Sequence, residues 1–203
     1  MPVTLKELAA YIEEANINHG FPEEYPHQIL LKFTTLSYTD TRGDHSLILG
    51  CAVSEDGGYL EIYASQAYST TTCKYKSALF ASMLQVAYMT KYLQLEHDQS
   101  DGEVRLAIDM PVLDGAVTKS QLLTMIFTLV ALLEEYHPVF VHAMSTGKID
   151  FDLAWAPESE ADDEEAAPTS PALSPDLQAL IAKVGGLDKL EALVAAQRAA
   201  GNG

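Results

Sequence analysis

The sequence has few basic residues and few cysteines. Its 203 residues contain 12 Lys and Arg against 29 Asp and Glu, a formal net charge of −17 at pH 7. Nucleic acid phosphates and anionic membrane surfaces repel so acidic a chain, so we expect binding to neither. The two cysteines, Cys51 and Cys73, form no CxxC pair, which argues against a disulfide framework and a zinc site. We expect both to be buried free thiols.

Motifs that carry chemistry are also missing. The sequence has no GxxxxGK(S/T), GxGxxG or GxSxG motif, so neither a phosphate-binding loop nor a nucleophile elbow is predicted. The six histidines are scattered and form no HExxH pair. An acidic loop at residues 96–101 could hold calcium, but it lacks the ligand spacing of an EF-hand. We therefore predict no catalytic residue, no metal site and no cofactor.

Long apolar runs are absent as well. The most apolar segment, residues 122–133, has the length of a buried helix and is too short to cross a bilayer. The N-terminal residues become acidic where a signal peptide would need an apolar run, so a cytoplasmic protein without a membrane partner is expected. A chain of this length can bury one core of usual size and carry an appendage.

Hydrophobic periodicity predicts an α+β domain at residues 1–156. The predicted elements are, in order, a helix at 5–15, strands at 27–39, 46–53 and 59–67, a helix at 76–90, strands at 92–96 and 104–108, and a helix at 119–136. Capping boxes open the first helix at Thr4 and the last at Thr118. After an interruption at Pro138, we expect a short helical turn at 139–144 and an edge strand or lid at 148–155. This order, α-β-β-β-α-β-β-α, predicts an antiparallel sheet packed against helices.

Two of these helices carry more apolar surface than one sheet face can easily hide. Apolar residues reach almost all the way round the helix at 76–90, which therefore needs cover on more than one side. The helix at 119–136 carries a wide apolar stripe. Because a large exposed apolar patch usually marks an interface, we predict that this stripe is a partner or dimer surface, made of Leu122, Met125, Ile126, Leu129 and Leu133. The alternative is a helix buried within its own subunit.

The composition changes sharply after residue 156. Residues 157–174 are acidic and rich in Pro, Ala and Ser, with no basic residue, which predicts a flexible linker. Two short helices are predicted at 175–200, and each is so short that it must pack on something to form. Their apolar residues are a second predicted partner surface, made of Leu177, Leu180, Ile181, Leu187, Leu190 and Leu193.

The order of elements and two local motifs resemble the YbjN family. The motifs are GEVRLAIDMP at residues 102–111 and the Thr-capped apolar helix from Thr118 to Pro138, which ends in EEYHP. The resemblance covers residues 5–145. It implies the α-β-β-β-α-β-β-α fold of the type III secretion chaperones, which are small acidic proteins that usually dimerise and hold an unfolded segment of a client.

The leading hypothesis is therefore a non-catalytic, chaperone-like or regulatory adaptor. It would bind a segment of another protein and form a homodimer, as the resemblance implies. The alternative is a small-molecule-sensing regulatory domain with a pocket between the helices and the sheet. An enzyme is a third possibility, which no set of residues supports.

Overall fold

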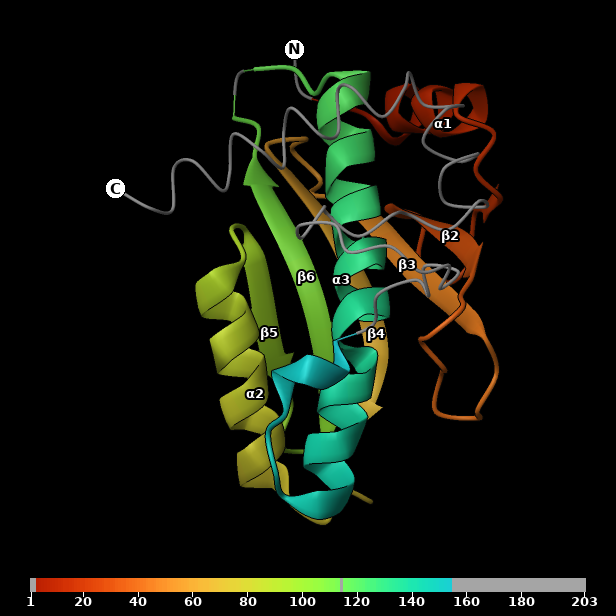
Figure 1. The fold of residues 1–203 in the computed structure, drawn as a ribbon. Helices are drawn as coiled ribbons and strands as arrows, with labels where there is room; N and C mark the ends of the chain where they lie inside the picture. The colour runs from red at the N-terminus through yellow and green to blue at the C-terminus, as the bar shows by residue number, and fades with distance from the viewer. Residues whose placement is uncertain (1–2, 114, 155–203) are drawn as a thin grey trace, which may run out of the picture. The chain divides into compact units, whose positions relative to one another are not determined.

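The computed structural model describes residues 3–113 and 115–154 (Figure 1). Its described helices are α1 (Leu5–Glu14), α2 (Lys76–Met89), α3 (Lys119–Thr146) and the 3-10 helix η1 (Phe151–Leu153). Its described strands are β1 (His19–Gly20), β2 (Gln28–Thr34), β3 (Ser46–Val53), β4 (Tyr59–Ser69), β5 (Leu93–His97) and β6 (Glu103–Pro111). The α+β class is confirmed. The predicted linker at 157–174 and the helices at 175–200 lie outside the described residues.

The strands form one antiparallel sheet in the order β1-β2-β3-β4-β6-β5. The two-residue strand β1, which the sequence pattern did not predict, pairs with β2 at one edge. On β4, Leu60, Ile62 and Ala64 are buried, whereas the alternating Tyr59 and Tyr63 are not. Because side chains alternate across a strand, the buried set faces the helices, which lie over this face in Figure 1.

The opposite face of the sheet carries a polar and aromatic cluster. Arg105 pairs with Glu61 at 3.2 Å and with Glu96. Its guanidinium carbon lies 5.4 Å from the centre of the Tyr63 ring, and that ring covers Gly50, where a Cβ atom would overlap it. One arginine thus contacts two carboxylates and an aromatic ring on the neighbouring strands, and these contacts join β4, β6 and β5 on this face of the sheet.

A bulge in β4 redirects the end of that strand. The pairing with β6 shifts register between Ala64 and Tyr68, and Gln66 within the bulge has φ of +49°. As a result Tyr68 is buried beside α3, with its ring 5.5 Å from the ring of Phe140. The bulge thus places a hydroxyl-bearing side chain in the layer between sheet and helix.

The apolar stripe of α3 is buried in its own chain. Leu122, Ile126, Leu129 and Leu133 are 0% exposed and Met125 is 8% exposed. The prediction that these residues form an exposed partner or dimer surface is therefore wrong. α3 contacts β4 and β6 as well as α1 and α2, so its stripe is covered by a sheet below and a helix on each side.

α3 continues through Pro138, where the sequence predicted an interruption. A proline inside a helix removes one backbone hydrogen bond and costs about 3 kcal/mol or more. Val139, Phe140 and Ala143, which follow it, are 0% exposed, so core packing offsets that cost. The helix ends at Gly147, whose φ of +77° suits glycine.

The predicted edge strand at 148–155 is wrong for the residues that the structure describes. Phe151–Leu153 form the 3-10 turn η1, and the Asp150 carboxylate accepts a hydrogen bond from the backbone N–H of Asp152. Alternation of apolar residues over so short a stretch does not separate a strand from a single turn that packs on α3.

By length and composition, α3 is apolar enough to cross a membrane. However, 61% of its most apolar 18-residue segment is buried inside the protein, and the core helix of a soluble protein has the same length and composition. Within residues 3–113 and 115–154, α3 is the only helix with these properties.

Candidate protein-binding surface

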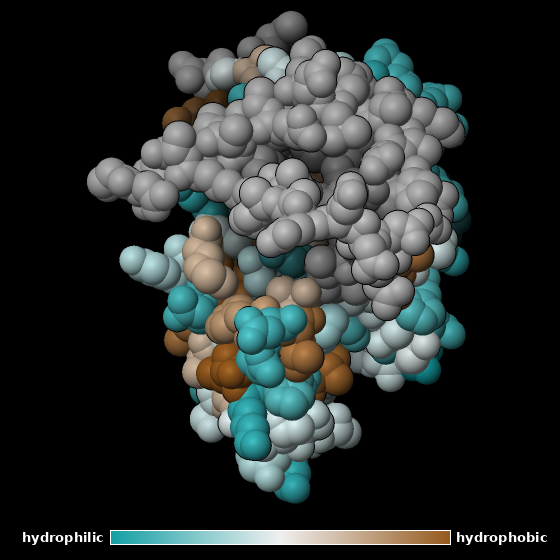
Figure 2. All heavy atoms as spheres, viewed as in Figure 1, coloured by the Kyte–Doolittle hydropathy of each residue, from teal (hydrophilic) through white to brown (hydrophobic). Residues whose placement is uncertain are grey.

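α2 buries one side and exposes the other. Leu79, Met83 and Val86 are buried against α3 and β5. On the outer side, Leu84 is 69% exposed and Tyr88 is 87% exposed. Figure 2 shows brown and tan hydrophobic surface over α2. Of the two helices with surplus apolar residues, α2 is thus the one that keeps an apolar side in solvent.

The outward residues of α2 follow a regular spacing. Ser77, Ala81, Leu84 and Tyr88, all exposed, stand at i, i+4, i+7 and i+11. Spacings of four, three and four residues put these side chains in one line along the helix. The a and d positions of a coiled coil have the same spacing. We call these four residues the α2 stripe. Its side chains are small near the N-terminus and bulky near the C-terminus.

A strained and exposed aromatic follows α2. Tyr92 is 73% exposed and its backbone has φ of +68°. The left-handed conformation costs a bulky L-residue about 1–2 kcal/mol. Strained positions of this kind cluster at functional sites. Tyr92 therefore belongs with the α2 stripe as a candidate contact.

The stretch of sequence that contains α2, residues 62–95, is the basic part of an acidic chain. No Asp or Glu occurs in residues 62–95, although the chain has 29. The same stretch contains the exposed lysines Lys74, Lys76 and Lys91. None of these three takes part in the five ion pairs found among the described residues. α2 thus presents an apolar stripe between lysines that form none of the ion pairs among the described residues, although Asp101 lines the same pocket as Lys76.

A groove of about 830 Å³ lies between the end of β4, the loop at 39–41 and the C-terminal half of α3. His137, 8% exposed, is buried beside it: its Nδ1 lies 3.1 Å from the Tyr68 hydroxyl and its Nε2 lies 3.3 Å from the Thr39 hydroxyl. Burial lowers the pKa of His137 to about 4, so its ring is neutral at pH 7. The groove is also lined by Gln66, Lys74, Asp101, Glu103, Val141 and Ser145.

Glu134 fastens the loop that leads into this groove. Its carboxylate accepts hydrogen bonds from the backbone N–H groups of Leu36, Ser37 and Tyr38, at 2.9, 2.6 and 3.2 Å. These contacts join residues almost a hundred positions apart, and no local signal predicts them.

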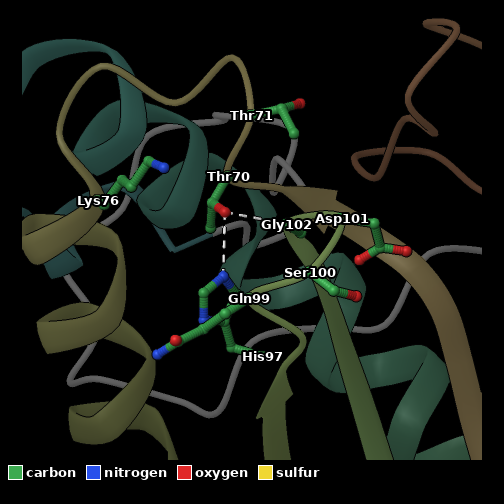
Figure 3. A pocket seen from close by; sticks show the side chains of 8 residues that line it. All are labelled: Thr70, Thr71, Lys76, His97, Gln99, Ser100, Asp101 and Gly102. Carbon is green, nitrogen blue, oxygen red and sulfur yellow. Dashed lines mark hydrogen bonds between the residues drawn. The ribbon is translucent and has the colours of Figure 1, made fainter.

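A smaller polar pocket of about 480 Å³ lies at the start of α2 (Figure 3). The Thr70 hydroxyl oxygen lies 3.0 Å from Nε2 of His97 and donates to the carbonyl oxygen of Gly102 at 3.2 Å. These bonds tie the end of β4 to the turn between β5 and β6. Three of the residues that line the pocket, Thr70, His97 and Gly102, thus bind one another, and we assign these three a structural role.

The acidic loop at 96–101 caps its own turn. The Asp98 carboxylate accepts from the backbone N–H of Ser100, and the Asp101 carboxylate accepts from that of Glu103. Within the described part of the chain, no three His, Cys, Asp or Glu side chains gather in a way that could hold a metal ion.

The thiols of Cys51 and Cys73 are both free and buried, as predicted. Burial raises the pKa of the Cys51 thiol to about 12. A thiol with so high a pKa carries almost no thiolate at pH 7 and is a poor nucleophile. Cys51 therefore acts as a small apolar side chain in the core.

The described part of the chain is thus an α+β protein whose helices cover one face of an antiparallel sheet and whose α2 exposes an apolar stripe. No family model and no curated protein matches the chain. Among solved structures, it is similar to the crystal structure of YbjN, a proposed transcription regulator from E. coli. The TM-score is 0.47 at 10% sequence identity, over 66% of this chain and 92% of that chain. Similarity at this level assigns neither a family nor a function.

Proposed function

We propose that this protein is a cytoplasmic, non-catalytic binding module, a chaperone-like or regulatory adaptor that receives a segment of another protein along α2. The observation that carries the proposal is the exposure of Leu84 and Tyr88 on an apolar helix face. Large apolar side chains that remain in solvent together mark interaction sites. Tyrosine is also among the residues most often found at the energetic centre of an interface.

The strength of such an interface can be bounded. Complete burial of one large apolar side chain contributes about 1.5–3 kcal/mol. Association costs at least about 4 kcal/mol in lost translational and rotational freedom. Leu84, Tyr88 and Tyr92 together therefore support a reversible complex, in keeping with an adaptor that exchanges its partner.

Site-specific photo-cross-linking in cells tests the proposal. A photoreactive phenylalanine analogue at position 88 should give a discrete cross-linked product, whereas the same analogue at the exposed position Gln85, outside the stripe, should not. Leu84→Asp should remove that product, and Gln85→Asp should leave it. Because both substituted side chains are exposed, both variants should keep the wild-type melting temperature. Equal products from positions 85 and 88 would overturn the proposal.

A second partner surface is proposed on residues 175–200, at the apolar positions predicted above. Leu180→Asp and Leu190→Asp in the full chain should then weaken capture of a partner without changing the melting temperature. Gln178→Asp, a substitution at a polar position of the same predicted helix, is the control. Unchanged capture by both leucine variants would remove this part of the proposal.

A small-molecule-sensing domain is the second candidate, and the groove beside His137 favours it. Its volume lies within the range of roughly 300–1,000 Å³ that is usual for ligand sites. A ligand at a hundred times its Kd stabilises the folded state by about 2.7 kcal/mol. Thermal-shift screening with nucleotides and metabolites measures this effect, and Val141→Trp, which narrows the groove, should abolish any true shift.

A further inference from the structure

We propose that the partner bound by α2 is an α-helix whose apolar heptad stripe is flanked by Asp and Glu. This inference rests on the proposed function and names the class of its partner. Two features of α2 carry it: the spacing of its exposed residues and the distribution of charge around them.

The spacing of the α2 stripe indicates a helical partner. Residues that alternate at four and three positions form a seam into which the a and d side chains of another helix fit as knobs into holes. Amphipathic helices bind apolar surfaces of this kind through anchors at i, i+3 or i+4, and i+7. Ser77 and Ala81 are small, so the partner's larger side chains fit at that end. Leu84 and Tyr88 fill the other end, where the partner's side chains are expected to be small.

The charges around α2 indicate acidic flanks on that partner. Lys74 and Lys76 stand at the N-terminal end of α2, and Lys91 follows its C-terminal end. No carboxylate occurs within residues 62–95. Asp101 lines the same pocket as Lys76, and Asp101 and Glu103 line the same groove as Lys74, but no ion pair joins them to these lysines. At physiological ionic strength, the carboxylates of the chain that lie further away than the Debye length of about 8 Å are largely screened. The lysines at the two ends of α2, which form no ion pair of their own, therefore favour acidic flanks on the partner.

The same charges argue against a second copy of this chain on α2. If two α2 helices packed antiparallel across a two-fold axis, Lys91 of one copy would approach Lys74 and Lys76 of the other. A parallel arrangement would place equal lysines side by side. Neither arrangement brings a carboxylate from residues 62–95 to the lysines. The homodimer implied by the family resemblance would have to use another surface.

Fluorescence anisotropy with two designed peptides tests the inference on the full-length protein. The probe is a fluorescein-labelled peptide of three heptads with Leu at a and d and Glu at e and g. The comparison peptide has Lys at e and g. We expect the Glu peptide to bind at least about tenfold more tightly, a difference of about 1.4 kcal/mol. Equal affinities, or tighter binding of the Lys peptide, would overturn the acidic partner.

Two sets of variants assign the binding to α2. Leu84→Ala and Tyr88→Ala should each weaken the Glu peptide by about tenfold or more, whereas Gln85→Ala should not. The double variant Lys76→Glu and Lys91→Glu should invert the preference between the peptides. Because all of these side chains are exposed, the variants remain folded, which circular dichroism verifies. An unchanged preference in the charge-reversed variant would overturn the inference.

The remaining outcomes separate this inference from the proposed function. If neither peptide binds but the cross-link at position 88 persists in cells, the partner is of another class and the proposed function stands. If light scattering shows a molar mass that doubles as the protein concentration rises, and Leu84→Ala restores the monomer mass, the α2 stripe binds a second copy of this chain. If the peptide binds only to the Leu190→Asp variant, the chain's own C-terminal segment occupies the α2 stripe in the wild-type protein. Each of these three results overturns the acidic helical partner.

Discussion

Glu134 shows how much of this fold depends on single polar residues. Its carboxylate holds three consecutive backbone N–H groups of the loop at 36–38. The Tyr38 side chain is buried below that loop and donates from its hydroxyl to the carbonyl oxygen of Ala67. One side chain on α3 thus holds residues 36–38, which lead into the loop at 39–41 that lines the groove.

Removal of this carboxylate should destabilise the protein measurably. Glu134→Ala leaves the three N–H groups without their acceptor, so we expect the free energy of unfolding to fall by about 1.5–3 kcal/mol. Urea denaturation measures the change. Glu135→Ala is the matched control, because Glu135 is exposed on the next position of the helix and should change stability by less than about 0.5 kcal/mol. Equal effects of the two substitutions would contradict this role.

Tyr92 is the residue at which stability and binding should oppose each other. Glycine adopts a positive φ without the penalty that a bulky side chain bears, so Tyr92→Gly should raise the free energy of unfolding by about 1 kcal/mol. The same substitution removes an exposed aromatic, so it should weaken partner binding. Thermal unfolding and peptide anisotropy measure the two effects. A variant that loses both stability and affinity would show that Tyr92 has a structural role instead.

At the scale of elements, α2 and α3 have similar apolar sequences and opposite surroundings. α3 lies over the middle of the sheet between α1 and α2, so its apolar residues are covered on every side that needs cover. α2 contacts β5, the last strand at its edge of the sheet, and α3. Its outer side therefore has no described neighbour to cover it.

A pair of aspartate substitutions separates the two helices. Ile126→Asp would place a charge at a site that is 0% exposed, so it should destabilise the protein by more than about 4 kcal/mol or prevent folding. Leu84→Asp lies on the exposed side of α2 and should change stability by less than about 0.5 kcal/mol. Circular dichroism during thermal unfolding distinguishes them. A well-folded Ile126→Asp monomer would contradict the burial of this helix and support the sequence prediction that α3 is a partner or dimer surface.

At the scale of the whole molecule, the net charge of −17 makes stability and partner binding depend on pH and salt concentration. His137 is a titratable group inside the fold, and its burial lowers its pKa. The homodimer expected from the family resemblance is also a property at this scale, and light scattering at several concentrations measures it.

His137 should make the fold sensitive to mild acid. Its pKa is about 4 in the folded state and 6.5 in the unfolded state. Between these two pH values, His137 is protonated in the unfolded chain and neutral in the folded chain. The free energy of unfolding should therefore be highest above pH 6.5 and fall as the pH drops towards 4. His137→Gln should have a smaller difference in stability between pH 7 and pH 5, measured by urea denaturation.

The other titrating groups are present in both the wild type and the His137→Gln variant, so their contributions to the pH dependence of stability cancel in the comparison. Burial raises the pKa of Glu61, which acts in the opposite direction, but Glu61 is present in both proteins. A variant with the same pH dependence as the wild type would assign the effect to surface carboxylates.

The sequence by itself determined several local features of the described residues. The capping boxes at Thr4 and Thr118 both form as predicted, and the predicted strand at 46–53 matches β3. These features depend on residues a few positions apart, so their information is local. Only the tertiary structure decided that α3 runs through Pro138, that Glu134 binds a distant loop, and that α2 and not α3 keeps an apolar side in solvent. Burial depends on neighbours that are far away along the chain, and periodicity alone does not identify them.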